Sequence, residues 1–289
     1  MKKIRMFCLL MPLFFILHAF ITITYDAKFV TFSVYTDSEK LTYQAIKFDR
    51  KDNRVRIKYF AAKDFDRKSV PRRYADWSTG RNIISVCSGT YMQSCKPDAS
   101  PVGLTIDQGW LVNKLISDSM DAIVIVYATG GIDVSNIKAG NLKVNNNDRI
   151  YNLKSSLDKG AFISWAQKAE ATVFQTHLLY YKNEIKIYDH SSPALRERRF
   201  LVGCTDKNGN LFNYIIHISN EVTLLTGVRS VATFLKVEER MRNIDFIINL
   251  DMGCQDHLTA YNSNGTVNLD FKGRVKIDKC VNLLSFYFE

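Results

Sequence analysis

Short apolar stretches with strand-like alternation recur along most of this chain, and they constrain its fold more than any other feature. Residues 42–48 and 55–60 flank the sequence Asp-Arg-Lys-Asp-Asn, and residues 200–205 and 211–218 flank Asp-Lys-Asn-Gly-Asn. Strands joined by short polar turns of this kind form antiparallel hairpins. We therefore predict two hairpins within a largely antiparallel sheet.

The remaining predicted elements are further strands and three helices, of which one is long. Further strands are predicted at residues 83–86, 101–106, 122–127, 172–181, 185–188 and 246–250. Short helices are predicted near residues 69–77 and 160–171, and apolar residues recur at helical spacing from about 222 to 242. The expected fold class is α+β, with a mixed, largely antiparallel sheet and a few helices packed against it.

The domain organisation follows from what separates the elements. Only five prolines occur, and no Ser/Gly-rich tract, repeat period or like-charge block divides the chain. We expect residues 25–289 to form one domain, which is long enough to bury its own core.

The N-terminus has the pattern of an export signal. Lys2, Lys3 and Arg5 precede an uncharged run from residue 6 to 23 that Pro12 and His18 interrupt. A basic start followed by an apolar segment is typical of a signal peptide. The run is near the lower limit for spanning a bilayer, so residues 1–24 are either a signal peptide or a signal anchor, with a buried helix as a third alternative. The expected location is outside the cytoplasm: periplasmic, envelope-associated or secreted.

The formal charge of +10 favours anionic partners. The basic residues are spread through the chain, and no groove-reading or base-stacking motif accompanies them. We expect no nucleic-acid partner, and membrane contact only through an N-terminal anchor.

The cysteines leave several pairings open. Cys87, Cys95, Cys204, Cys254 and Cys280 follow the N-terminal segment. Because five is an odd number, at least one thiol should stay free in a compartment that permits disulfides. Cys87 and Cys95 could close a small loop, or the cysteines could be buried as small apolar residues.

One acid stands at a position that often carries function. The apolar strand predicted at residues 246–250 stops at Asp251, and the chain then turns through Met-Gly-Cys-Gln-Asp-His. A buried strand that ends at an acid can hold a carboxylate rigidly at the mouth of a site, although such acids also cap helices or face solvent. Asp251 is therefore a candidate catalytic residue.

Several short motifs follow one another in a characteristic order. They are Ser88-Gly89-Thr90-Tyr91, Pro101-Val102-Gly103-Leu104, Gln175-Thr176, Arg199 four residues before Gly203, and Asn249-Leu250-Asp251 with Gly253. In this order, over residues 70 to 265, they resemble the phosphodiester glycosidase family, whose members include exported bacterial proteins.

The resemblance implies an activity and a set of site residues. It implies hydrolysis of a glycosyl phosphodiester, with a glycosyl phosphodiester or a phosphorylated glycan as the partner and with no cofactor and no metal ligand among the site residues. Arg199 and Asp251 would be catalytic, with the planar Arg199 guanidinium facing two phosphate oxygens. The residues implied for substrate binding are Gly89, Tyr91, Gln175, Gly253, Gln255 and Asp256. Alternatively, Arg199 forms a surface ion pair, with Arg196 and Arg198 as solvated neighbours.

The second carboxylate that a glycosidase usually needs stays open at this point. Asp256 is nearest to Asp251 in sequence, and Asp107, Asp133 and Glu170 are the other candidates.

The sequence departs from the family pattern at the same motifs. Cys87 stands in place of an asparagine, Met252 replaces a glycine, Cys254 and Gln255 end the glycine-rich run, and His177 follows the Gln-Thr pair. A side chain at Met252 obstructs the close approach of backbone N–H groups to an anion. The alternative function is a catalytically impaired protein that binds phosphorylated glycans, and Cys87 could pair with Cys254 across the site.

Two other chemistries are weaker alternatives. Cys254, His257 and Cys280 outline an incomplete zinc site that lacks a fourth ligand. A Cys-His nucleophile could combine Cys87 or Cys254 with His177, His190 or His257.

Overall fold

The computed structural model describes residues 27–51, 54–61, 68–96, 99–139, 142–144, 147–188 and 192–289. The predicted export segment, residues 1–24, lies outside the described residues, and so does His190. Within the described part, none of the helices has the length and apolar character needed to cross a membrane.

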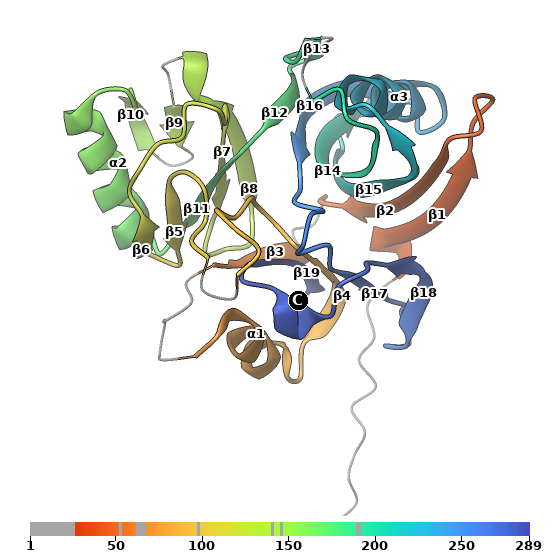
Figure 1. The fold of residues 1–289 in the computed structure, drawn as a ribbon, viewed down its shortest axis with the longest axis horizontal. Coiled ribbons are helices and arrows are strands. Elements are labelled where there is room, and N and C mark those ends of the chain that lie inside the picture. Colours follow the sequence, from red (N-terminus) through yellow and green to blue (C-terminus); the bar gives the residue numbers. More distant parts are fainter. Residues whose placement is uncertain are drawn as a thin grey trace, which may run out of the picture.

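The largest sheet of the described structure is antiparallel and has seven strands (Figure 1). In spatial order its strands are β1 (Val30–Thr36), β2 (Thr42–Asp49), β15 (Leu211–Val222), β14 (Arg196–Asp206), β16 (Met241–Asn249), β12 (Leu178–Tyr181) and β13 (Glu184–Ile185). Helix α3 (Leu224–Val237) packs its buried side chains on one face of this sheet. The other face turns toward the centre of the molecule.

Two five-stranded antiparallel sheets complete the fold. The first contains β6 (Trp110–Asn113), β5 (Thr105–Asp107), β11 (Thr172–Thr176), β7 (Ala122–Val126) and β8 (Ile132–Asn136). Helix α2 (Ser156–Lys168) packs on it, beside the small pair β9 (Leu142–Val144) and β10 (Asn147–Tyr151). The second contains β18 (Val267–Lys272), β17 (Leu258–Tyr261), β4 (Asn82–Cys87), β19 (Leu283–Phe288) and β3 (Val55–Phe60). Helix α1 (Val70–Ser78) covers its outer face (Figure 1).

One central core joins the three sheets. Phe48 of β2 stacks on Phe286 of β19 with ring centroids 4.0 Å apart, and Tyr59 of β3 stacks on Phe174 of β11 at 4.4 Å. Each contact joins side chains from two different sheets, and each ring is almost fully buried. Since large aromatic side chains bury much apolar surface, these contacts fix how the sheets lie against one another.

The predicted fold class is confirmed, because antiparallel sheets dominate and three α-helices pack against them. The hairpin predicted at residues 200–205 and 211–218 forms as β14 and β15. Its turn is stabilised locally, since Asp206 Oδ1 accepts hydrogen bonds from the backbone N–H groups of Asn208 and Asn210.

The other hairpin prediction is wrong. Strand β2 pairs with β1 and β15, whereas β3 pairs with β19 in a different sheet. A polar turn brings two strands near each other in sequence, but the partner of β3 lies at the C-terminal end of the chain. The pairing is decided by the burial of both strands against the central core.

The long helix is shorter than predicted, since α3 spans Leu224–Val237 and not residues 222–242. Thr223 caps its start by accepting a hydrogen bond from the Thr226 N–H. Arg240, with φ of 55°, turns the chain into β16, which begins at Met241. Met241 buries its side chain in the same cluster as the helix, so its apolar character extended the helical pattern past the true end.

The site is positioned where the seven-stranded sheet meets the sheet of β4 and β17. The Asp251 N–H, just past β16, donates to the Gly89 carbonyl (2.9 Å), and the Ser88 N–H donates to the His257 carbonyl (3.1 Å). These bonds tie the loop after β4 to the loop after β16. The Ser88–Tyr91 motif and the Asn249–Asp251 motif, which are distant in sequence, therefore lie side by side at the site.

Candidate functional site

A cavity of about 490 Å³ opens at this junction. It is lined by the start of β14, the loop after β16 and the loop after β4, and it includes Tyr91, Arg199, Asp251, Gly253 and Asp256 among its lining residues. Five of the eight predicted site residues thus surround one cavity. Gly89, Gln175 and Gln255 do not line it. Another cavity, of about 470 Å³ between α3 and the β1–β2 turn, has none of the predicted residues in its wall.

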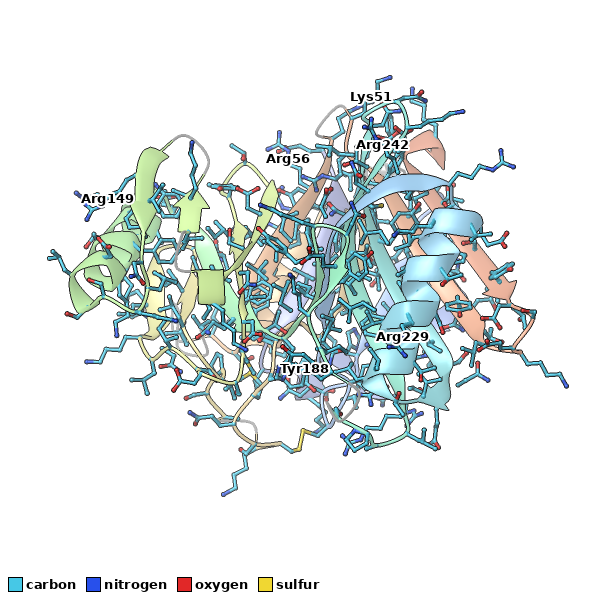
Figure 2. The ribbon with its side chains drawn as sticks, turned by 90° about the horizontal axis from the view of Figure 1, so that it is seen from above. Lys51, Arg56, Arg149, Tyr188, Arg229 and Arg242 are labelled. Carbon is cyan, nitrogen blue, oxygen red and sulfur yellow. A yellow bond between two sulfur atoms is a disulfide. The ribbon has the colours of Figure 1, made fainter. Side chains whose placement is uncertain are left out.

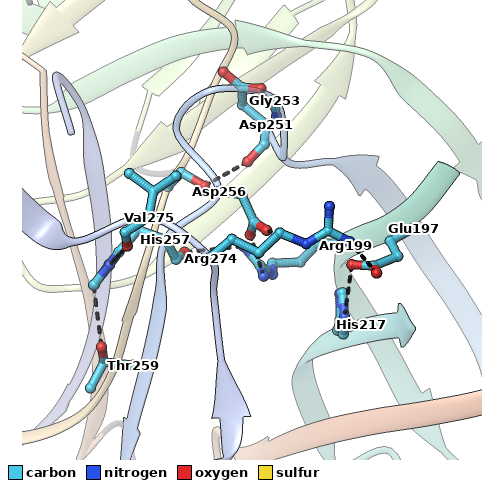
Figure 3. Close-up of polar contacts among 11 residues, drawn as sticks. Glu197, Arg199, His217, Asp251, Gly253, Asp256, His257, Thr259, Arg274 and Val275 are labelled. Atoms are coloured by element: carbon cyan, nitrogen blue, oxygen red, sulfur yellow. Dashed lines mark hydrogen bonds and ion pairs between the residues drawn. The ribbon is translucent and has the colours of Figure 1, made fainter. Parts of the chain in front are cut away.

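Asp251 is held firmly at the end of β16 (Figure 3). Its Oδ1 accepts a hydrogen bond from the Gly253 N–H (2.9 Å), and its carbonyl accepts one from the Ser88 hydroxyl (2.5 Å). The residue is 8% exposed. Burial raises the pKa of the Asp251 carboxyl above its ordinary value, while the Gly253 hydrogen bond opposes that rise. A carboxyl group in this environment is suited to proton transfer nearer neutral pH.

Arg199 is fully buried and is not the surface ion pair that the alternative interpretation expected. Its Nη2 donates to Asp256 Oδ1 (2.8 Å) and its Nη1 donates to the His257 carbonyl (3.0 Å), as Figure 3 shows. Arg198, expected to be a solvated neighbour, is also buried. Only Arg196 of the three arginines is exposed.

Asp256 is committed to this ion pair. It is 3% exposed, and its Oδ2 lies 3.9 Å from the Nε of Arg274. A buried carboxylate between two guanidinium groups keeps its charge compensated. Asp256 therefore acts first as a structural counter-ion in the wall of the cavity.

Tyr91 borders the cavity from the loop after β4. Its hydroxyl accepts a hydrogen bond from Asn249 Nδ2 on β16, and its ring meets the His177 ring edge-on with centroids 5.0 Å apart. Burial raises the pKa of Tyr91, so the phenol keeps its proton at physiological pH. The Tyr91 hydroxyl is thus a hydrogen-bond donor available to a ligand.

Gly89 has a packing role. A Cβ at this position would lie 2.4 Å from the Tyr59 ring and 2.9 Å from Asn282 Oδ1. The Gly89 N–H donates to the same Asn282 oxygen (2.7 Å). The glycine is required because the backbone passes against a buried ring, and the pattern in the sequence reflects this contact.

Gln175 and Gln255 hold loops in place. Gln175 Oε1 accepts hydrogen bonds from the N–H groups of Leu104 (2.7 Å) and Ser117 (2.9 Å), and it lies against Gly103, where a Cβ would come within 2.5 Å of it. Gly103 also has a φ of +83°, which favours glycine. Gln255 Oε1 accepts from the Val281 N–H (3.0 Å). Both side chains are buried and satisfied by backbone groups.

A disulfide joins Cys95 to Cys254, which neither predicted pairing anticipated. It links the loop after β4 to the loop after β16 and lies at the edge of the molecule, where Figure 2 shows the bond between two sulfur atoms. The proposed Cys87–Cys254 and Cys87–Cys95 pairs are wrong, because Cys87 is a buried free thiol in β4. The expectation of a leftover thiol is confirmed by Cys87, Cys204 and Cys280.

The disulfide also removes the alternative chemistries. Cys254 has no thiolate to offer as a nucleophile or as a metal ligand. Burial raises the pKa of Cys87 to about 12, so this thiol stays protonated. No cluster of three histidine, cysteine or acidic residues suited to a metal occurs in the described part of the chain.

Sequence reasoning missed several lining residues. Glu197 and Glu221 add two carboxylates to the cavity, and Arg274 joins Met252, a position already identified in the sequence, at its rim. Glu197 pairs with Arg274 (Figure 3), whereas Glu221 is exposed at the end of β15. Period-two alternation along β14 places Glu197 on the same face as Arg199, which is a signal that could have identified it. Arg274 and Glu221 reach the cavity only through the tertiary fold, so no local pattern identifies them.

The three other candidates for a second carboxylate lie elsewhere. Asp107 forms a buried ion pair with Arg73 (2.7 Å), and Asp133 accepts a hydrogen bond from Tyr127 (2.5 Å). Glu170, with φ of 49°, lies in the turn between α2 and β11. None of the three lines the cavity.

No protein-family model matches the sequence, and no curated protein matches it. Several solved structures are similar at low sequence identity. The zebrafish N-acetylglucosamine-1-phosphodiester alpha-N-acetylglucosaminidase catalytic domain, auto-inhibited by its pro-peptide, aligns with 90% of this chain and 82% of its own, at 15% identity and a TM-score of 0.48. A hypothetical protein from Synechocystis aligns with 90% of this chain at 9% identity and a TM-score of 0.50. This chain spans 62% of that protein's length.

A Burkholderia pseudomallei protein described as exported aligns with 86% of this chain and 74% of its own, at 11% identity and a TM-score of 0.42. At these identities the likeness concerns the fold alone. What this chain shares with the Synechocystis protein is the overall fold, an α+β arrangement of mostly antiparallel sheets.

Proposed function

We propose that this protein is an exported hydrolase that cleaves a sugar from a glycosyl phosphodiester in the cavity at the end of β16. The observation that carries the proposal is the position of Asp251. Its carboxyl borders a cavity that four arginines also line, so a proton-transferring group and anion-binding groups share one site. The order of the sequence motifs points to the same chemistry.

The chemistry assigns Asp251 to proton transfer at the glycosidic oxygen. Its burial raises the pKa of the carboxyl, as an acid catalyst requires. Glycosidases usually need a second carboxyl group. In this proposal Glu221 supplies it, because Asp256 and Glu197 are engaged by Arg199 and Arg274.

A second candidate function is binding of phosphorylated glycans without turnover. Two observations favour it: Met252 occupies the rim of the cavity, and Cys254 is fixed in a disulfide. A bulky side chain and a constrained loop restrict the backbone N–H groups that could otherwise surround an anion.

Export is supported by the same disulfide. Cys95 and Cys254 are far apart in sequence, and stable disulfides are characteristic of proteins outside the cytoplasm. The basic and apolar N-terminal segment supports the same location. Detection of the protein in the envelope or medium, and its absence there once residues 1–24 are deleted, tests this part of the proposal.

The test of the activity is a cleavage assay on sugar 1-phosphodiesters that differ in the sugar. We expect the protein to release the sugar from at least one of them, and Asp251→Asn to slow the reaction about 100-fold or more. Glu221→Gln should slow it as well. Asp270→Asn, which changes an exposed residue on β18, is the matched control and should leave the rate unchanged.

Binding to a panel member without sugar release would support the second candidate and contradict the hydrolase. Neither binding nor release across the panel would contradict both.

A further inference from the structure

We propose that the anionic group of the ligand is held by Arg198 and Arg196, and that Arg199 is a positioning residue which holds the loop carrying Asp251. The assignment deepens the proposed function, and it rests on that function only in taking a phosphate as the anion. It reverses the roles that the sequence resemblance implied, in which Arg199 faces the phosphate.

Arg199 is screened from a ligand by its full burial and by the two bonds of its terminal nitrogens. Its Nη2 donates to Asp256 and its Nη1 donates to the His257 carbonyl, whereas its Nε is buried without a hydrogen-bond partner among the described residues. Its side chain is 0% exposed. A phosphate that replaced Asp256 at the Arg199 Nη2 would displace a buried carboxylate and leave the Asp256 charge uncompensated.

The bonds of Arg199 order the loop after β16, which carries Asp251. Asp256 and His257 follow Asp251 within the same turn of chain, and the His257 carbonyl also accepts the Ser88 N–H. Arg199 therefore connects β14 to the loop after β16 at two points. An arginine placed in this way fixes the position of Asp251 without touching the ligand.

The Arg198 guanidinium, in contrast, has no acidic partner among the described residues. Its Nε donates to the Val222 carbonyl (3.3 Å) and its Nη2 donates to the Ala194 carbonyl (2.7 Å). Both partners are neutral, and among the described residues Nη1 has none. The two bonds hold the guanidinium in one orientation while its charge remains available to an anion.

Further donors lie beside Arg198. Arg196 lies two residues before it on β14, lines the cavity, and makes no ion pair with any residue that the structure describes. Tyr91 borders the same cavity, and its hydroxyl accepts from Asn249, which leaves the phenolic proton free to donate. Two uncompensated cations and a neutral O–H donor fit the oxygens of a phosphodiester.

The experiment measures binding of inorganic phosphate by titration calorimetry at low ionic strength, with the full exported protein. We expect Arg198→Gln to weaken binding about 10-fold or more, because a charge-assisted contact is lost. Arg242→Gln is the matched control, with the same change of charge. Arg242 is exposed at the start of β16, about 23 Å along the strand from Asn249, and Figure 2 labels it at the opposite edge from the disulfide. It should bind phosphate within twofold of the unsubstituted protein.

Arg199→Lys keeps the charge beside Asp256 and should leave phosphate affinity within about threefold while lowering thermal stability. Its positioning role has a separate readout, which is the titration of the Asp251 carboxyl followed by carbon NMR. The Arg199 charge lowers the pKa of Asp251, so Arg199→Gln should move that titration to higher pH. Arg198→Gln should leave it in place.

Unchanged phosphate affinity in Arg198→Gln would overturn the assignment, as would loss of binding in a folded Arg199→Lys protein or no phosphate binding by the unsubstituted protein. The two proposals can fail separately. Diester cleavage with an unchanged KM in Arg198→Gln would refute this assignment and leave the hydrolase standing. Phosphate binding that depends on Arg198, without any cleavage, would do the reverse.

Discussion

Removal of the Cys95–Cys254 disulfide should strongly destabilise the protein. The two cysteines are 159 residues apart in sequence, so the bond closes a very long loop of the unfolded chain. Loop-closure entropy for that length is about 17 cal/mol/K, which corresponds to about 5 kcal/mol at 25 °C. We expect the Cys95→Ala, Cys254→Ala protein to lose about 3–5 kcal/mol of unfolding free energy.

Equilibrium denaturation in urea, followed by intrinsic fluorescence, measures this loss. The denaturant dependence should also steepen, because the unfolded chain without the bond exposes more surface. Cys204→Ala, which changes a buried free thiol, is the control and should leave that dependence unchanged. A loss below about 1 kcal/mol with an unchanged slope would refute the reasoning, as would a thiol count above three in the non-reduced, denatured chain from residue 25 onward.

Three further predictions concern the wall of the cavity. Arg199→Met and Asp256→Asn should each lower the free energy of unfolding by about 3–5 kcal/mol, because each single change leaves a buried charge without its partner. The double variant should lose less than the sum of the two, and additive losses in a double-mutant cycle would contradict the ion pair. Gly89→Ala should lower the free energy of unfolding by about 1–3 kcal/mol through overpacking, whereas Gly160→Ala, in an open position of α2, should raise it by about 0.5–1 kcal/mol. Urea midpoints compare the two variants, and equal effects would contradict the contact at Gly89. The raised pKa of Asp251 means that the folded state holds this proton more tightly, so stability is lost as pH rises from the ordinary 3.8 through the folded value. The stability of Asp251→Asn relative to the unsubstituted protein should thus increase as pH rises from 4 to 7, because the asparagine does not titrate. A difference in urea midpoint that stays constant over this range would contradict the prediction.

Local patterns identified most elements correctly where the physical cause was local. The turn at Asp206 satisfies its own backbone donors, and the strands beside it paired as predicted. The end of β16 at Asp251 was also visible, because an apolar run stops abruptly there. In contrast, the prediction of a β2–β3 hairpin was wrong, because β3 pairs with β19 at the C-terminal end of the chain.

Motif residues were recognised more reliably than their roles. Gly89 and Gln175 stand out in the sequence, yet the structure commits both to packing and loop support. Arg199 was identified as a site residue, but its burial against Asp256 could be known only once two distant segments were in contact. The same pattern in sequence is compatible with ligand binding and with structural support.

The sequence by itself determined the fold class, the β14–β15 hairpin and the position of Asp251 after a strand, because alternation, turn residues and apolar runs act over a few neighbouring residues. Only the tertiary structure decided which arginine keeps an uncompensated charge, which cysteines pair and which carboxylates border the cavity. These outcomes depend on contacts between residues far apart in the chain, as the 159-residue separation of Cys95 and Cys254 illustrates. Burial and counter-ions follow from such contacts, and they set the chemistry of each group at the site.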